Sequence, residues 1–260
     1  MRLKSFIIVI ISILSLGIQS LRSQEVPQPF LEFTEHPWVD SVFRSLTPDE
    51  RIGQLIWIEL QPGDEIEQYI RLNDIVRKNH AGGIIFSGGR PERLAEMVNY
   101  FQKVSEVPLF IIRKNDTRPG LEMDSVISFP SGTTLGSVHD DELIRRMGLA
   151  VAEQYIRAGV NVSLNSPGQP VKNEILFRES LLNNGIITVS RDFPLSFRTG
   201  TYIPVSADDP ESTVREISEK VRKNIISRQD IDDQCRKILS AKYWAGLSHF
   251  SSIEEHNLSD

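Results

Sequence analysis

The chain has 260 residues, of which 40% are hydrophobic and 25% charged, and its formal net charge is −6. These values are typical of a globular protein with a sizeable core, and they exclude a disordered or fibrous chain. The 29 basic and 35 acidic residues form no long block of one sign. A nucleic-acid-binding protein needs a basic stripe, so we expect no nucleic-acid partner.

The first residues have the pattern of a secretory signal peptide. Two basic residues precede the apolar run "FIIVIISILSLGI", and small and polar residues follow it. The run is shorter than the roughly 20 residues of a membrane span, so retention as an anchor is the less favoured alternative. We predict a signal peptide over residues 1–23, no stable membrane span after its cleavage, and a periplasmic or extracellular protein.

Cys235 is the only cysteine, so the protein cannot hold an internal disulfide. Ile231, Ile238 and Leu239 share its expected helical face, and no histidine is close in sequence. We therefore interpret Cys235 as a small core residue and not as a nucleophile.

Six apolar segments read as strands: "GQLIWIEL", "GGIIFSGG", "VPLFII", "GVNVSL", "GIITVS" and "TYIPV". Strands that are apolar on both faces and joined by helical crossovers indicate a parallel sheet covered by helices. No G-x-G-x-x-G follows the first strand, so a doubly wound dinucleotide fold loses its best support. A complete eight-unit barrel takes about 250 residues. For residues 37–248 the pattern of strands therefore predicts an α/β fold, an abridged TIM-type (β/α) barrel with about six parallel strands.

Capping residues mark several helix ends in this segment. Thr47 and Glu50 form a capping-box pattern around Pro48, and Asp140 is placed to cap the helix that follows it. A helix is expected from Pro91 to about Ser105, and the final helix begins at Arg228 and ends at Gly246. A long loop is expected between residues 113 and 139. We predict a linker over 24–36 and a C-terminal tail over 249–260.

Several segments together resemble a known family. They are "WVDSVFRSLTPDERIGQLIWIE", "AGGIIFSGG", "MDSVISFPSGTTLGSVHDDELIRRMGLAVAEQYIRAGVNVSL" and "DIDDQCRKILSAKYWAGL". The chain is similar to the catalytic barrel domain of glycoside hydrolase family 3, nearest to the bacterial β-N-acetylglucosaminidases. The resemblance covers most of residues 38–247, with a large gap in the second half.

The resemblance implies a retaining hydrolase of O-glycosyl bonds, of the β-N-acetylhexosaminidase type. In the family, an Asp on a T-D-x-x-M loop attacks the anomeric carbon, and an Asp–His dyad in a D-S-H segment protonates the leaving oxygen. A K-H-F-P-G-H-G-D-T loop and an Asp after the third strand hold the N-acetyl sugar. Retention needs both the nucleophile and the acid, one on each side of the scissile bond.

The loop after the third strand departs from this pattern. The family reads D-A-E-W-G-L-G-M-R where this chain has "KNDTRPGLE". Lys114 therefore stands at the sugar-binding Asp, Asp116 at the following Glu, and Glu122 at the Arg. A carboxylate that accepts sugar hydroxyls is replaced by an ammonium that can only donate.

The stretch "TVSRDFPLSFRTG" can be placed on the family in two ways. In the first, "SRDFP" stands for A-K-H-F-P, so that Arg191 replaces Lys, Asp192 replaces His, and Phe193–Pro194 are kept. In the second, "GIITVS" is the strand that carries the nucleophile, and Ser190 stands where the Asp belongs. Under both placements the nucleophile and the acid dyad are missing, and the gap removes about two β/α units of the barrel.

Other charged residues follow the strands and are expected at the active end of the barrel. The acidic ones are Glu59, Asp64, Asp116, Glu122, Asp192 and Asp208, and the basic ones are Arg113, Lys114, Arg118, Arg191 and Arg198. Asp116 and Asp192 are the candidates for displaced catalytic carboxylates, although basic neighbours favour the ionised form of both. The candidates for substrate binding are Lys114, Asp116, Arg191 and Asp192.

The five histidines do not form a metal site in the sequence. His80 precedes a strand and so belongs to the end of the barrel opposite the chemistry, and His139 lies beside the capping Asp140. No two histidines have metal-ligand spacing, so we expect no metal and no cofactor.

Four hypotheses follow from these observations. The leading one is an exported, catalytically inactive relative that keeps a shallow site for an amino-sugar or peptidoglycan fragment. The second is an active glycosidase with displaced carboxylates. The third is a non-enzymatic remnant that binds a protein partner, such as an intact homologue. The fourth is a product that barely folds, because losing barrel units exposes strand edges.

Overall fold

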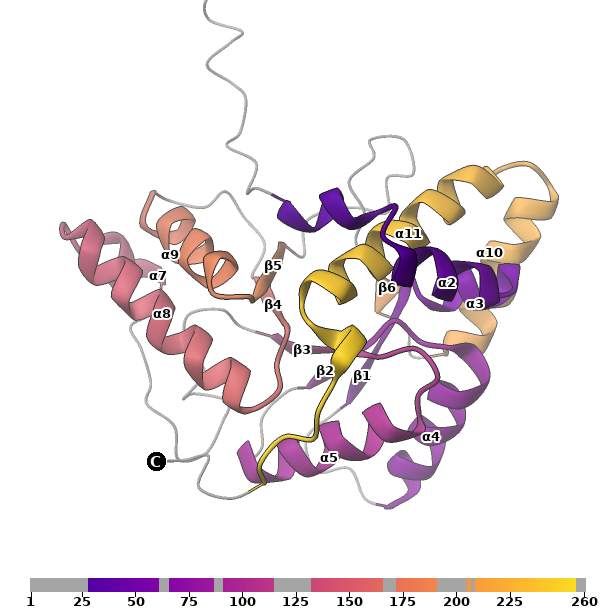
Figure 1. Ribbon diagram of the computed structural model, residues 1–260, viewed down its shortest axis with the longest axis horizontal. Helices are drawn as coiled ribbons and strands as arrows, with labels where there is room; N and C mark the ends of the chain where they lie inside the picture. The colour runs from indigo at the N-terminus through magenta and orange to yellow at the C-terminus, as the bar shows by residue number, and fades with distance from the viewer. Residues whose placement is uncertain are drawn as a thin grey trace, which may run out of the picture.

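The computed structural model describes residues 28–60, 66–86, 91–114, 132–165, 172–190, 205–206 and 209–255. Strands at the centre are surrounded by helices (Figure 1). The strands are β1 (Ile56–Leu60), β2 (Gly83–Phe86), β3 (Phe110–Lys114), β4 (Val162–Asn165), β5 (Ile187–Ser190) and β6 (Val205–Ser206). The helices are η1 (Pro29–Phe33), α2 (Pro37–Ser45), α3 (Pro48–Gly53), α4 (Ile66–Asn79), α5 (Pro91–Val104), α7 (Gly132–Gly136), α8 (Asp141–Arg157), α9 (Lys172–Asn183), α10 (Pro210–Arg222), α11 (Arg228–Trp244) and η2 (Leu247–His249).

The six strands form one parallel sheet in the order β5-β4-β3-β2-β1-β6. The first five strands are neighbours in chain order, as in the wall of a (β/α) barrel, and β6 returns to pair with β1. In a closed barrel the last strand pairs with the first, so β6 occupies the closing position. Among the described residues β5 and β6 do not pair with each other. The fold is the abridged TIM-type barrel that the sequence predicts, with six parallel strands among the described residues.

The two faces of the sheet belong to different hydrophobic clusters. Ile58, Ile84 and Ile111 pack with α4, α5, α8 and α9, the helices that connect the strands. Ile85 and Ile112 lie on the other face, in a cluster with residues of α10 and α11. We call this second face, which carries Ile85, Ile112, Val162, Leu164 and Ile187, the inner sheet face. Side chains alternate between faces along each strand, so these clusters fix the direction of the remaining strand residues.

Two glycines of the predicted "AGGIIF" strand are required by close packing. A Cβ at Gly82 would lie 1.9 Å from the Gln54 carbonyl oxygen, and a Cβ at Gly83 would lie 2.6 Å from Ile112 Cδ1. The N-terminal end of β2 therefore approaches its neighbours more closely than any other residue allows.

The predicted helix signals are confirmed at three places. Thr47 and Glu50 form the reciprocal capping box of α3, and Asp140 caps α8. After α11, Gly246 adopts a left-handed conformation with φ 77°. One difference is α7, a short helix inside the segment 113–139, for which a loop is predicted.

The regions beside the predicted barrel domain also contain ordered contacts. In residues 24–36, η1 packs on α11, Ser240 donates a hydrogen bond to the Phe30 carbonyl, and His36 stacks on Tyr243 with ring centroids 3.7 Å apart. In residues 249–260, Ile253 exchanges two backbone hydrogen bonds with the Asn99 side chain, at 2.8 and 2.9 Å. Figure 1 shows η1 and α2, in indigo, beside the yellow α11. The two ends of the described chain thus pack onto the same barrel.

The predicted signal peptide, residues 1–23, lies outside the described residues. Within the described part of the chain, the structure contains no helix both long and apolar enough to span a membrane.

Candidate functional site

The carboxyl ends of the strands bring two charged residues together on the inner sheet face. Ile58 and Leu60 of β1 face the connecting helices, so Glu59 between them faces inward. Phe110 and Ile112 of β3 face inward, and Lys114 continues their series. Glu59 and Ile112 are level across β2, because both pair with Ile85. β2 lies between the strand of Glu59 and the strand of Lys114. The register places Lys114 two residues further toward the carboxyl end of the sheet than the level of Glu59.

Glu59 and Lys114 form an ion pair in which the Lys114 ammonium donates a hydrogen bond to Glu59 Oε1. The side chains are 15% and 21% exposed, respectively, so both are partly shielded from water. Lys114 stands where the family resemblance implies a sugar-binding carboxylate. This part of the barrel therefore contains a carboxylate, but it is that of Glu59 on β1, and it forms an ion pair with Lys114.

Arg113, the neighbouring basic residue, points the other way. It follows Ile112 and so shares the face of Ile111, toward the connecting helices, and its side chain is 1% exposed. Arg113 therefore contributes to the packing of the outer face and not to the charge of the inner face. The predicted basic cluster at the strand ends is split by the alternation of β3.

The other predicted site residues lie outside the described residues. These are Asp116, Arg191 and Asp192, together with Asp64, Arg118, Glu122, Arg198 and Asp208. Of the predicted substrate-binding residues, the structure therefore places only Lys114. Glu59 is the one carboxylate that the described strand residues carry, whereas a retaining glycosidase needs two carboxyl groups about 5–5.5 Å apart.

The pairing of β5 decides between the two placements of "TVSRDFPLSFRTG". Val162 to Asn165 of β4 pair in register with Ile187 to Ser190 of β5. Ser190 therefore ends the fifth strand of the wall, which favours the first placement, in which "SRDFP" follows the fifth strand. The strand positions between β5 and the closing β6 are the ones where the two missing β/α units would belong.

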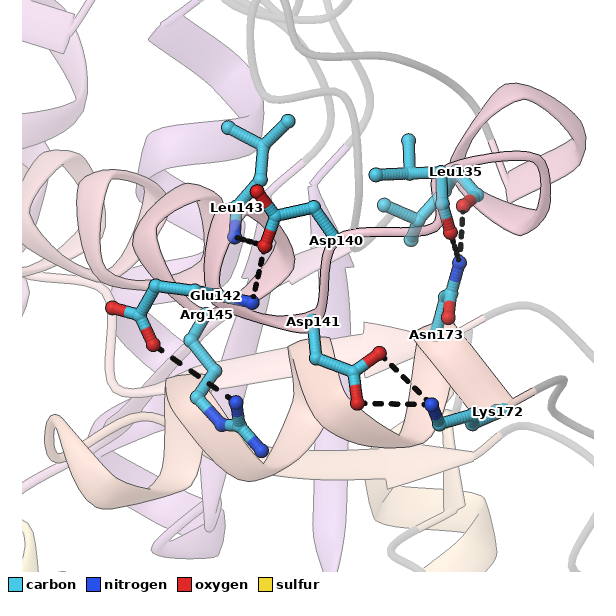
Figure 2. Close-up of polar contacts among 9 residues, drawn as sticks. Leu135, Asp140, Asp141, Glu142, Leu143, Arg145, Lys172 and Asn173 are labelled. Carbon is cyan, nitrogen blue, oxygen red and sulfur yellow. Dashed lines mark hydrogen bonds and ion pairs between the residues drawn. The ribbon is translucent and has the colours of Figure 1, made fainter.

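The segment before α8 is built by local contacts and not by catalytic groups. Figure 2 shows the Asp140 carboxylate accepting from the backbone amides of Glu142 and Leu143, at 2.9 and 3.2 Å. Asp141 pairs with Lys172 at 2.9 Å, and the Asn173 side chain donates to the Leu135 carbonyl at 2.7 Å. This region of the family-like "SGTTLGSVHDDEL" stretch fixes α7, α8 and α9 against one another.

A second polar cluster lies at the opposite end of the barrel. Lys242 is fully buried and its ammonium donates to Gln54 Oε1 at 2.7 Å, while Gln54 donates to the His80 carbonyl at 2.6 Å. Burial lowers the pKa of Lys242 to about 7, and the nearby Cys235 opposes the shift in part. His80 itself lies 3.2 Å from Glu50. These residues join the N-terminal ends of β1 and β2 to α11, at the end of the sheet opposite Glu59 and Lys114.

Cys235 lies in the core, as the sequence predicts: it is fully buried, and burial raises the pKa of its thiol to about 12. Within the described residues, no three His, Cys, Asp or Glu side chains are grouped to hold a metal ion.

A cavity of about 500 Å³ lies between helices and not at the strand ends. Its lining residues belong to α3, α4, α10 and α11, and include Ile52, Val214 and Ile231. Several charged residues at its rim have partners of their own, such as Arg215 with Glu211. The cavity therefore lies between α3, α4, α10 and α11, and the Glu59–Lys114 pair does not line it.

Sequence reasoning did not single out the Glu59–Lys114 pair or the Lys242 cluster. Glu59 is 55 residues from Lys114, and their meeting depends on the register of three strands. Lys242 lies in the "AKYWAGL" segment, and the only sequence signal for its burial is that it shares a helical face with the buried residues of α11.

Comparisons with known proteins give a match in structure only. No protein-family model and no curated protein matches the sequence. The β-glucoside phosphorylase BglX bound to 2FGlc aligns with a TM-score of 0.69 at 14% identity, over 87% of this chain and 64% of that chain. A β-glucosidase from Erythrobacter marinus aligns with a TM-score of 0.61 at 11% identity, over 85% and 46%.

A glycoside hydrolase family 3 β-N-acetylglucosaminidase from Paenibacillus sp. str. FPU-7 aligns with a TM-score of 0.48 at 19% identity, over 57% of this chain and 33% of that chain. The chain spans less than two thirds of the length of each of these structures. At these identities the likeness concerns the fold. Over most of its length the chain shares the barrel fold of the β-glucoside phosphorylase and the β-glucosidase, in abridged form.

Proposed function

We propose that this protein is an exported, catalytically inactive member of glycoside hydrolase family 3 that binds amino-sugar or cell-wall glycan fragments. The observation that carries the proposal is the ion pair at the carboxyl ends of β1 and β3. Lys114 takes the position of the sugar-binding Asp and holds Glu59. The site keeps polar groups at the place where the barrel would meet a sugar, without a second carboxylate among the described strand residues.

Inactivity is supported by the order of the strands. The family resemblance assigns the nucleophile and the acid dyad to loops of the second half of the barrel. Among the described residues, β6 is the next strand after β5 and pairs with β1, so six strands are described where a complete barrel has eight. Without a nucleophile the covalent intermediate cannot form, and without the dyad the leaving oxygen is not protonated.

The class of ligand is supported by the resemblance and by the structural neighbours. The resemblance points to β-N-acetylglucosaminidases, and two of the neighbours are described by their names as acting on β-glucosides. Export is supported by the signal-peptide pattern of residues 1–23, which would place the protein where cell-wall fragments occur.

The proposal is tested by measuring binding and turnover on the same preparation. Fluorogenic β-N-acetylglucosaminide and β-glucoside substrates should give no turnover above a heat-denatured sample. Calorimetric titration with chitobiose or a muropeptide should give saturable binding. Flat titrations for both ligands contradict the binding function. Turnover that disappears in Asp116→Asn or Asp192→Asn contradicts the inactivity and identifies a glycosidase with displaced carboxylates.

A further inference from the structure

The cavity between α3, α4, α10 and α11 has the size of a small-molecule site. Its volume is about 500 Å³, and pockets that hold small ligands commonly have volumes of about 300–1,000 Å³. The helix α4 follows β1, whereas α10 follows β6, the strand that pairs with β1. The cavity therefore lies where the last described unit of the barrel wall meets the first.

Part of the lining is apolar. Ile52 of α3 and Ile231 of α11 are each 3% exposed and belong to the hydrophobic cluster of the inner sheet face. Val214 and Val221 of α10 are half-buried and pack against the same cluster. A ligand with an apolar body would remove the exposed part of these four side chains from water, which favours its binding.

Eight charged side chains also line the cavity, and six of them already have partners within the chain. The pairs are Asp232 with Arg51 at 3.0 Å, Lys78 with Asp74 at 3.2 Å, Glu211 with Arg215 at 3.3 Å and Arg222 with Glu219 at 4.0 Å, while Glu50 belongs to the capping box of α3 and lies 3.2 Å from His80. Asp49 and Arg228 are the other two. Within the described residues neither of them forms an ion pair, and Asp49 accepts a hydrogen bond from the neutral Ser218 hydroxyl at 2.5 Å.

Asp49 and Arg228 therefore offer one negative and one positive charge to a ligand. Both residues are exposed, so a ligand can reach them. Arg228 is the first residue of α11, where the helix dipole disfavours a positive charge, so a carboxylate from outside the chain would stabilise it. A guanidinium can bind a carboxylate through two parallel hydrogen bonds, and the Asp49 carboxylate can accept from an ammonium. The complement of the cavity is a molecule with an apolar body, an ammonium and a carboxylate.

We propose that this cavity binds a short apolar peptide with free termini. The side chains of the peptide pack against the apolar part of the lining, its ammonium contacts Asp49, and its carboxylate contacts Arg228. A ligand with a single charge would leave one of these two residues without a counter-ion. The inference does not rest on the proposed glycan-binding function, since the Glu59–Lys114 pair does not line this cavity.

The experiment is calorimetric titration of the full chain with dileucine and with trileucine, each as the free peptide, with an acetylated N-terminus and with an amidated C-terminus. The variants are Asp49→Asn, which can still accept from Ser218, and Arg228→Met, which keeps a good helix former at that position. The matched controls are Asp141→Asn and Lys172→Met, which make the same changes of charge in an exposed ion pair that does not line the cavity. Circular dichroism confirms that each variant is folded.

We expect the wild type and both controls to bind at least one of the free peptides saturably and with equal affinity. Acetylation and amidation should each weaken binding by about threefold to fivefold, as the loss of an exposed ion pair does. In Asp49→Asn acetylation should make no further difference, and in Arg228→Met the same holds for amidation, because the charge that the terminus meets is gone.

Flat titrations of the wild type with both free peptides overturn the inference. Equal affinity for the free and the blocked peptides overturns the ligand class. A variant that still distinguishes the free terminus from the blocked one shows that the substituted residue is not the contact, and overturns its assignment. Each of these results leaves the glycan-binding function standing, because that function is tested by separate titrations with sugars.

Discussion

Lys242 is fully buried, and its ammonium donates a hydrogen bond to the amide oxygen of Gln54. Lys114, in contrast, donates to the carboxylate of Glu59. A neutral acceptor does not offset the loss of hydration of the charge, so the pKa of Lys242 falls to about 7. The unfolded chain keeps the ordinary value of 10.5. Between these two values the unfolded state binds more protons than the folded state.

The contribution of Lys242 to the free energy of unfolding should therefore rise with pH from about 7 to about 10.5 and be lost as the pH falls through this window. One pKa unit corresponds to about 1.4 kcal/mol, so the upper limit of the effect is roughly 5 kcal/mol. Lys242→Met removes the titrating group. Urea unfolding of both proteins at pH 7, 9 and 10.5 measures the difference.

As the pH rises, the free energy of unfolding of the wild type should increase relative to that of Lys242→Met. Cys235 also titrates differently in the two states, because burial raises the pKa of its thiol to about 12, and Lys242 in turn lowers that pKa. Both proteins are therefore compared in a Cys235→Ala background, in which Lys242 is the only difference. A difference that is the same at all three pH values would show that the Lys242 ammonium is not shielded from water.

At the residue scale, local patterns predict local contacts well. The capping box of Thr47 and Glu50, the Asp140 cap and the burial of Cys235 all follow from positions a few residues apart. The Glu59–Lys114 pair could not be predicted in this way. It needs a defined register across β1, β2 and β3, and a shift of one residue would turn Lys114 to the other face.

The N-terminus of α8 offers a comparison between two adjacent carboxylates. Asp140 accepts hydrogen bonds from two backbone amides of the first turn, whereas Asp141 pairs with a Lys172 side chain that is 72% exposed (Figure 2). Asp140→Ala should lower the free energy of unfolding by about 1 kcal/mol, because the amides lose their acceptor. Asp141→Ala should cost less than about 0.5 kcal/mol, since exposed ion pairs contribute little. Urea unfolding of the two variants measures both values, and a larger cost for Asp141→Ala would contradict the account.

The packing of α8 on α9 depends on Gly148. A Cβ at this position would lie 2.6 Å from Ser180 Cβ and 3.1 Å from the Phe177 carbonyl oxygen. Gly148→Ala gains about 1 kcal/mol of helix propensity, but overpacking costs about 1–3 kcal/mol, so we expect a net loss. Thermal unfolding should show a lower Tm for the variant.

Ser180→Gly provides the matching control for Gly148→Ala. It removes the side chain that the new methyl group would meet, so the double variant should recover part of the loss. If the double variant recovers no stability and the effects of the two substitutions simply add, then α8 and α9 do not stay in this close contact in solution.

At the element scale, the apolar strands and most of their helices follow from the sequence because hydrophobic periodicity is a local property. The helix α9 was not singled out, since its buried residues Phe177, Ser180 and Leu181 mix polar and apolar positions. The short α7 was also missed, because its sequence "GTTLG" carries two glycines and a β-branched pair. Tertiary contacts such as those of Asn173 hold it in place.

For the whole molecule, the decisive feature is the pairing of β6 with β1. The sequence predicts about six strands and resembles a family whose barrel has eight. It does not show which of the eight strand positions these six strands occupy. The sheet order keeps the first five strands and the closing strand. The part of the wall between them is the part to which the resemblance assigns the nucleophile and the acid. The central proposal is therefore that the barrel fold is kept here without the nucleophile and the acid that the family resemblance implies.

This claim is tested most directly by intact-protein mass spectrometry after incubation with a mechanism-based fluorosugar that traps glycosyl-enzyme intermediates. A retaining family 3 hydrolase treated in parallel should gain the mass of one sugar. The protein described here should keep its unmodified mass. A covalent glycosyl adduct on any of its side chains, for example Asp116 or Asp192, would contradict the claim.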